Sequence, residues 1–113
     1  MNYYPKNLVF HVHTKYSYDS RLEPQYIVDF LVKANIHQVI ITDHNEILGA
    51  LEAKEYAEKK YPDKLEVIIG EEIKTDIGDI IGFPLYEKII PGNHNTVIKE
   101  IQTQNAFVCL PHP

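Results

Sequence analysis

The chain has almost no cysteine, no tryptophan and no long apolar run. Its 113 residues contain one cysteine, Cys109, so no disulfide can form within the chain. No apolar stretch approaches the ~20 residues that a membrane-spanning helix needs. The N-terminal residues Met1–Pro5 lack the apolar segment of a secretion signal. We therefore expect residues 1–113 to form a single cytoplasmic domain that does not associate with a membrane.

Positive charge is also scarce. Lysine and arginine number 11 against 16 aspartates and glutamates, which gives a formal net charge of −5 at pH 7. Without a basic cluster, an autonomous nucleic-acid binding module is not expected. A nuclease is not excluded, because bound metal ions can offset local negative charge. The hydrophobic content of 44% is sufficient for a globular core.

Short apolar runs alternate with helical patterns along the chain, as is typical of parallel α/β folds. Strands are predicted over residues 8–13, 38–42, 65–69 and 106–110. Helices are predicted from Pro24 to about Asn35, from about Glu46 to Tyr61 with Asn45 as the cap, and from residue 95 or 96 to 104. Residues 71–83 leave no room for a helix, and a β-hairpin that turns at Asp76–Gly78 is expected there, after the third strand.

Histidines and carboxylates follow the predicted strands. His11 and His13 alternate in the first strand, so both side chains are expected on one face. Because the carboxyl ends of parallel strands share one edge of a sheet, the residues after the other strands should lie nearby. These are Asp43-His44, Glu71-Glu72 and His112. Imidazole and carboxylate together suit zinc, manganese or iron, and a carboxylate such as Glu72 can bridge two ions, as in enzymes that hydrolyse phosphate esters.

Each of these motifs also has an ordinary interpretation. A lone His-x-His pair is more often incidental than a metal site, and Glu71-Glu72 suits a solvated turn. The four motifs together favour a metal site, because each one ends an apolar strand. A two-residue hairpin turn would also place Glu72 and Asp79 on the same face. Tyr16 and Tyr18, in the first long loop, could line a pocket, but ordinary packing is the expectation.

Four segments resemble the PHP (polymerase and histidinol phosphatase) family of metal-dependent phosphoesterases. They are residues 10–20 (FHVHTKYSYDS), 41–45 (ITDHN), 69–73 (IGEEI) and 110–113 (LPHP), in the family's order. The resemblance implies an α/β fold, the first part of a distorted, TIM-like β/α barrel. The final Asp-x-His motif of the family is absent. A compact half-barrel, a homo-oligomer that completes the site, or a missing C-terminal segment are the alternatives.

The resemblance also implies a set of site residues. More than one divalent ion, Zn, Mn or Fe, is expected on His11, His13, Asp19, His44, Glu72, Asp79 and His112. Asp79 stands where many members of the family have a histidine. Asp43 is expected either to ligate a metal or to orient a ligand. Lys15 and Arg21 are candidates for holding the substrate phosphate, although solvated loop cations are the commoner interpretation.

The implied function is hydrolysis of a phosphorylated small molecule or a short oligonucleotide by a metal-activated water. The sequence has no serine or cysteine nucleophile arrangement and no glycine-rich phosphate loop. Two alternatives remain open. One is a non-catalytic metal-binding scaffold or interaction domain, which the absent motif favours. The other is a metal-dependent hydrolase that acts on a different ester or amide.

Overall fold

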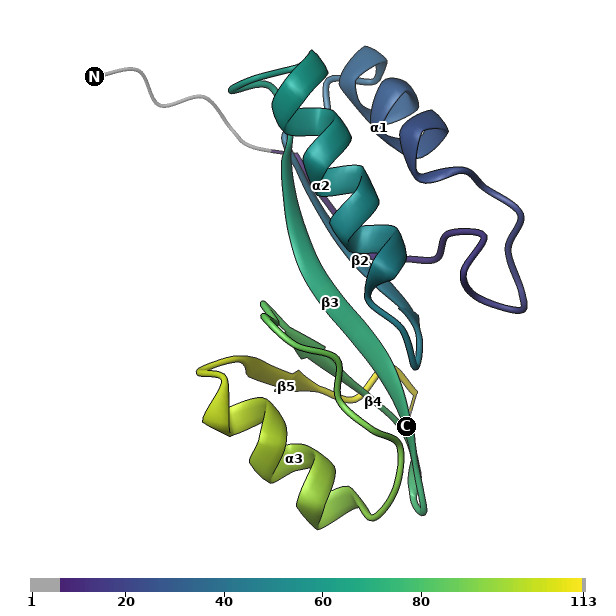
Figure 1. Ribbon diagram of the computed structural model, residues 1–113, viewed down its shortest axis with the longest axis vertical. Coiled ribbons are helices and arrows are strands. Elements are labelled where there is room, and N and C mark those ends of the chain that lie inside the picture. Colours follow the sequence, from purple (N-terminus) through teal and green to yellow (C-terminus); the bar gives the residue numbers. More distant parts are fainter. Residues whose placement is uncertain (1–6, 113) are drawn as a thin grey trace.

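The computed structural model describes residues 7–112 (Figure 1). Residues 1–6, which include the whole segment Met1–Pro5 considered for a secretion signal, and residue 113 lie outside the described residues. Among residues 7–112, no helix is long and apolar enough to cross a membrane. The elements, in chain order, are β1 Leu8–Val12, α1 Pro24–Lys33, β2 Gln38–His44, α2 Leu48–Lys60, β3 Glu66–Thr75, β4 Gly78–Phe83, α3 His94–Thr103 and β5 Phe107–Cys109.

The five strands form one sheet in the order β1-β2-β3-β4-β5. β1, β2 and β3 run parallel, whereas β4 is antiparallel to both of its neighbours. The sheet is curled like half of a barrel. Although two strands separate β1 from β4, the rings of Phe10 and Phe83 lie 5.5 Å apart across the concave face. The chain is therefore a mixed α/β structure that corresponds to part of a TIM-like barrel.

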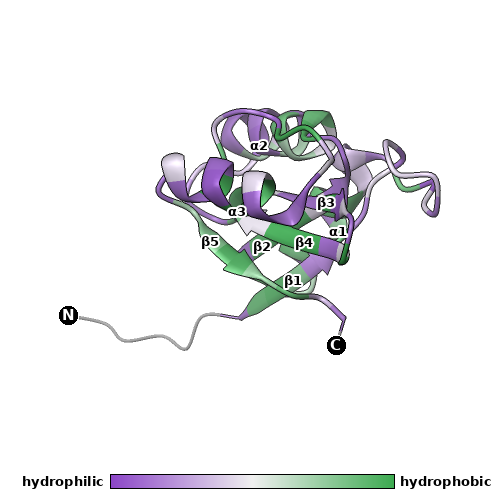
Figure 2. Cartoon of the chain, turned by 90° about the horizontal axis from the view of Figure 1, so that it is seen from below, coloured by the Kyte–Doolittle hydropathy of each residue, from purple (hydrophilic) through white to green (hydrophobic). Residues whose placement is uncertain are grey.

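The helices pack on the convex face of this sheet. α1 and α2 lie side by side along β1–β3, and α3 lies against the β4–β5 end (Figure 1). Two apolar clusters fill the space beneath them. The first includes Val28, Val39 and Ile41, all fully buried, and the second includes Ile73 and Ile101. In Figure 2, the apolar stretches of β1, β4 and β5 lie below α2 and α3.

The extent of β3 and the starts of α2 and α3 differ from the sequence-based expectations, and the other boundaries lie within two residues of them. β3 does not end near Ile69 but runs unbroken to Thr75, so the antiparallel pair with β4 uses the continuation of β3 rather than a separate strand. The prediction that Asn45 caps the second helix is wrong. The cap position is Ile47, and the Asn45 side chain instead accepts a hydrogen bond from the Lys74 amide. α3 begins at His94, where the side chain of Asn93 accepts from the Asn95 amide.

Candidate metal centre

A β-bulge in β1 sets the direction of the first two histidines. Phe10 pairs with Ile40 and Val12 with Ile41, so His11 is an extra residue without a partner position. His11 has a φ of 69°, in the left-handed region that a non-glycine residue rarely adopts. The bulge allows Phe10 and His11, adjacent in sequence, to contact residues on the same concave face. Simple strand alternation, which the sequence pattern predicts, would have placed these two side chains on opposite faces.

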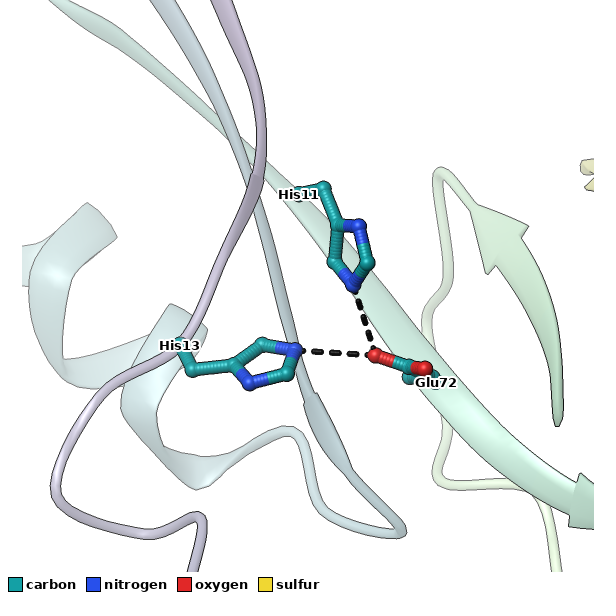
Figure 3. A group of neighbouring side chains, drawn as sticks. All are labelled: His11, His13 and Glu72. Atoms are coloured by element: carbon teal, nitrogen blue, oxygen red, sulfur yellow. Dashed lines mark hydrogen bonds and ion pairs between the residues drawn. The ribbon is translucent and has the colours of Figure 1, made fainter. Parts of the chain in front are cut away.

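Glu72, in the middle of β3, is the point where the two histidines meet. Nε2 of His11 lies 2.7 Å from Glu72 Oε1, and Nε2 of His13 lies 2.9 Å from the same oxygen (Figure 3). The Glu72 side chain is fully buried, whereas the two imidazoles are partly exposed. The parallel pairing of β2 with β3 places Glu72 beside His44, at the level where β2 ends. Three segments distant in sequence therefore converge on the concave face of the sheet, beside the carboxyl end of β2.

Asp19 connects the loop after β1 to the end of β2. Its carboxylate lies 3.1 Å from Nδ1 of His13 and 3.2 Å from Nε2 of His44. The imidazole rings of His13 and His44 are 4.5 Å apart. Because Asp19 is six residues beyond His13, the intervening loop must fold back on itself to make these contacts.

Asp79 and His112 approach Glu72 from other elements. Asp79 pairs with Lys74 across the β3–β4 ladder, which places it on the same face as Glu72. Nε2 of His112 lies 3.7 Å from Glu72 Oε2, the oxygen that the other histidines leave free. The side chain of His112 is 68% exposed. It is the least enclosed of the histidines near Glu72.

Among the described residues, three overlapping groups have the composition and spacing to hold a metal ion. They are His11, His13 and Glu72; His13, Asp19 and His44; and His44, Glu72 and Asp79, with the ligand atoms of each group within 4.8 Å of one another. A neutral imidazole has one free lone pair, so His13 or His44 can serve only one ion at a time. A carboxylate has two oxygens and can serve two. The first and third groups, which share Glu72, can therefore be occupied together.

The ionisation of the carboxyl groups reflects this crowding. Burial raises the pKa of Glu72, but hydrogen bonds from His11 and His13 outweigh it, so the pKa lies below its ordinary value. The same balance, with His13 and His44 as partners, lowers the pKa of Asp19. For Asp79, burial and then the neighbouring Glu72 raise the pKa. A carboxyl group whose ionisation is opposed by a neighbouring carboxylate, as that of Asp79 is by Glu72, belongs to a donor set suited to a divalent cation.

Asp43 lies on the opposite face of β2 from His44, and it belongs to none of the three groups. Its buried carboxylate accepts hydrogen bonds from the amide and hydroxyl of Thr14, both at 2.6 Å, and from the hydroxyl of Ser17 at 2.7 Å. The Ser17 hydroxyl in turn accepts from the His44 amide. Asp43 therefore holds the loop that carries His13 and Asp19. Of the two roles expected for it, these contacts favour orientation over ligation.

Asp43 and its neighbours hold the loop that carries His13 and Asp19. Two parts of this arrangement, Gly49 and the Thr14–Ser17 pair, were not predicted from the sequence. A Cβ added at Gly49, in the first turn of α2, would lie 2.2 Å from Thr14 Oγ1 and 2.3 Å from Asp43 Oδ2. Glycine is thus required where the helix approaches the buried carboxylate. The sequence signal that could have indicated this close approach is an isolated glycine inside a helical pattern.

The two candidates for holding the substrate phosphate, Lys15 and Arg21, differ in their salt-bridge partners. The Lys15 ammonium lies 3.0 Å from Glu23 Oε2, and this bond raises the Lys15 pKa. The salt bridges among residues 7–112 include none from Arg21, which is exposed in the loop after β1. Phosphate binding by either residue stays a prediction.

Comparison with known proteins gives two results. The sequence model of a family described as "PHP domain" matches residues 10–109. An uncharacterized protein of Methanocaldococcus jannaschii is 40% identical over 114 aligned residues, which cover 91% of this chain. The alignment covers 65% of that relative, so the chain spans less than two thirds of the relative's length.

Proposed function

Because the chain belongs to the PHP domain family, we propose that it forms the metal-binding part of a phosphoesterase that hydrolyses a small phosphate ester or a short oligonucleotide. The observation that carries the proposal is the pair of ligand groups that share Glu72. The family usually binds divalent metals, and two bridged ions are the common machinery for displacement at phosphorus. Histidine and carboxylate ligands suit Zn, Mn or Fe.

Each residue has a definite part in this proposal. His11 and His13 would hold one ion together with Glu72, and His44 and Asp79 would hold a second ion together with the same carboxylate. Asp19 and His112 complete the ring of donors. Divalent ions bound there would make a water molecule more acidic and offset the charge of the phosphate oxygens. Asp43, through Thr14 and Ser17, holds the His13 loop in place before substrate arrives.

The test is a comparison of metal content and phosphate release for the wild type and Glu72→Gln, after loading with Mn²⁺ or Zn²⁺. Glutamine keeps the shape but removes the charge and the bridging capacity. We expect metal affinity and hydrolysis of a chromogenic phosphate ester to fall by about 100-fold or more. The matched control is Glu66→Gln, in the same strand but at its exposed beginning.

The outcomes separate the proposal from its alternative. Metal binding that depends on Glu72 without turnover of any phosphate ester would contradict catalysis and support the non-catalytic scaffold. Equal metal binding by the wild type and Glu72→Gln would contradict both the proposed phosphoesterase and the non-catalytic metal-binding scaffold. Circular dichroism of each variant shows whether a loss reflects the site or the fold.

A further inference from the structure

Tyr18 is an exposed aromatic residue at the edge of the proposed metal centre. Its ring centroid lies 4.8 Å from that of His44, with 33° between the ring planes. The residue is nevertheless 88% exposed, so solvent reaches most of the ring, including the side that faces away from His44. The next residue is Asp19, which contacts both His13 and His44. A flat, open surface therefore stands directly beside the ligand cluster.

Three tyrosines of the described chain have hydroxyl partners that Tyr18 lacks, whereas the exposed Tyr26 and Tyr86 resemble Tyr18 in this respect. The Tyr16 hydroxyl donates to Glu52, and the hydroxyls of Tyr56 and Tyr61 both donate to Asp29 at 2.7–2.9 Å. The hydrogen bonds of the described residues include none from the Tyr18 hydroxyl. The expectation of ordinary packing thus fits Tyr16 and fails for Tyr18. Exposure alone is ordinary for a surface tyrosine, and what distinguishes Tyr18 from the exposed Tyr26 and Tyr86 is its position beside His44.

We propose that Tyr18 determines specificity by stacking against a flat ring of the substrate, which selects nucleoside monophosphates over phosphate esters that lack a base. This inference rests on the proposed function of the adjacent site. Aromatic side chains stack on any nucleobase through its π face. In a nucleoside monophosphate, one ribose separates the nucleobase from the phosphate. It can therefore place the phosphate at the His44–Glu72 side of the cluster while the base covers Tyr18.

The experiment compares two probes, adenosine 5′-monophosphate and ribose 5-phosphate, in which the sugar carries adenine or a hydroxyl group, respectively, at C1′. Binding to the Mn²⁺-loaded protein is measured by calorimetry, and hydrolysis by phosphate release. We expect the wild type to prefer the nucleotide by about tenfold, the preference to disappear in Tyr18→Ala, and Tyr18→Phe to retain it. The matched control is Tyr86→Ala, because Tyr86 is 81% exposed but lies in the loop after β4.

Two results would overturn the inference. One is a wild type that binds both probes equally. The other is a Tyr18→Ala protein that loses both in the same proportion, which would mean that Tyr18 only orients His44. If neither probe is hydrolysed but the nucleotide preference depends on Tyr18, the proposed catalysis fails while the stacking role stands. If both probes are hydrolysed without preference, the stacking role fails while the proposed catalysis stands.

Discussion

Glu71 and Glu72 are adjacent, fully buried carboxyl groups on opposite faces of the same strand. Glu72 faces the concave side, where histidines hold its pKa below the ordinary value. Glu71 faces the helix-covered side, where burial raises its pKa to about 7. One Glu71 oxygen accepts from the Ile89 amide, and the other lacks a partner in the described residues. Burial alone therefore does not decide ionisation; the partners that each face supplies do.

The two faces differ in the same way for apolar residues. The convex face is covered by three helices, and Ile41 and Ile73 there are fully buried. The concave face has no layer above it in the described chain, so Phe107 is 68% exposed although it belongs to a strand. One face of the sheet thus packs against helices to form a core, whereas no helix of the described residues covers the other face. Substitutions on the two faces should have very different consequences.

The largest contrast is expected between Ile41→Ala and Phe107→Ala. The first leaves a cavity in the helix-covered core and should cost about 4 kcal/mol of unfolding free energy. The second removes an exposed ring and should cost less than about 1 kcal/mol. Urea denaturation measures both, with Ile41→Val as the milder variant if the alanine protein does not fold. Similar losses at the two sites would mean that the concave face is covered in solution.

Glu71→Gln should stabilise the protein at alkaline pH. Because the folded-state pKa is raised, the folded protein retains a proton that the unfolded chain loses above about pH 4.5, so stability falls as pH rises towards about 7. Glutamine does not titrate. The free energy of unfolding of Glu71→Gln should therefore exceed that of the wild type by at most roughly 3 kcal/mol above about pH 7. Denaturation at about pH 5 and pH 8.5 measures it. A pH-independent difference would contradict this linkage.

A smaller effect is expected for Gly49→Ala, which tests the link between the convex face and the site. The added methyl group would meet Thr14 and Asp43, so we expect a loss of about 2 kcal/mol and weaker metal binding as the His13 loop shifts. Gly92→Ala is the matched control, since nothing lies within 4 Å of a Cβ added there. If Gly49→Ala bound metal as tightly as the wild type, the loop would not depend on this close approach.

Several features of the fold were accessible from sequence because they depend on local patterns. Helical periodicity located α1 and α3 to within about two residues, and the asparagines after them adopt the left-handed conformation that ends helices. The extent of β3 was not accessible. Gly70-Glu71-Glu72 has the composition of a turn, and only pairing with β2 on one side and β4 on the other keeps it extended.

The sequence by itself determined the family and the ligand types, because histidines and carboxylates that follow apolar strands are specified residue by residue. Only the tertiary structure decided which of them meet. The bulge at His11, the continuation of β3 through Glu72 and the Asp43 contacts all depend on neighbours that are distant in the chain. A strand specifies which residues alternate, but the curvature of the sheet and the packing of its loops fix where those residues point.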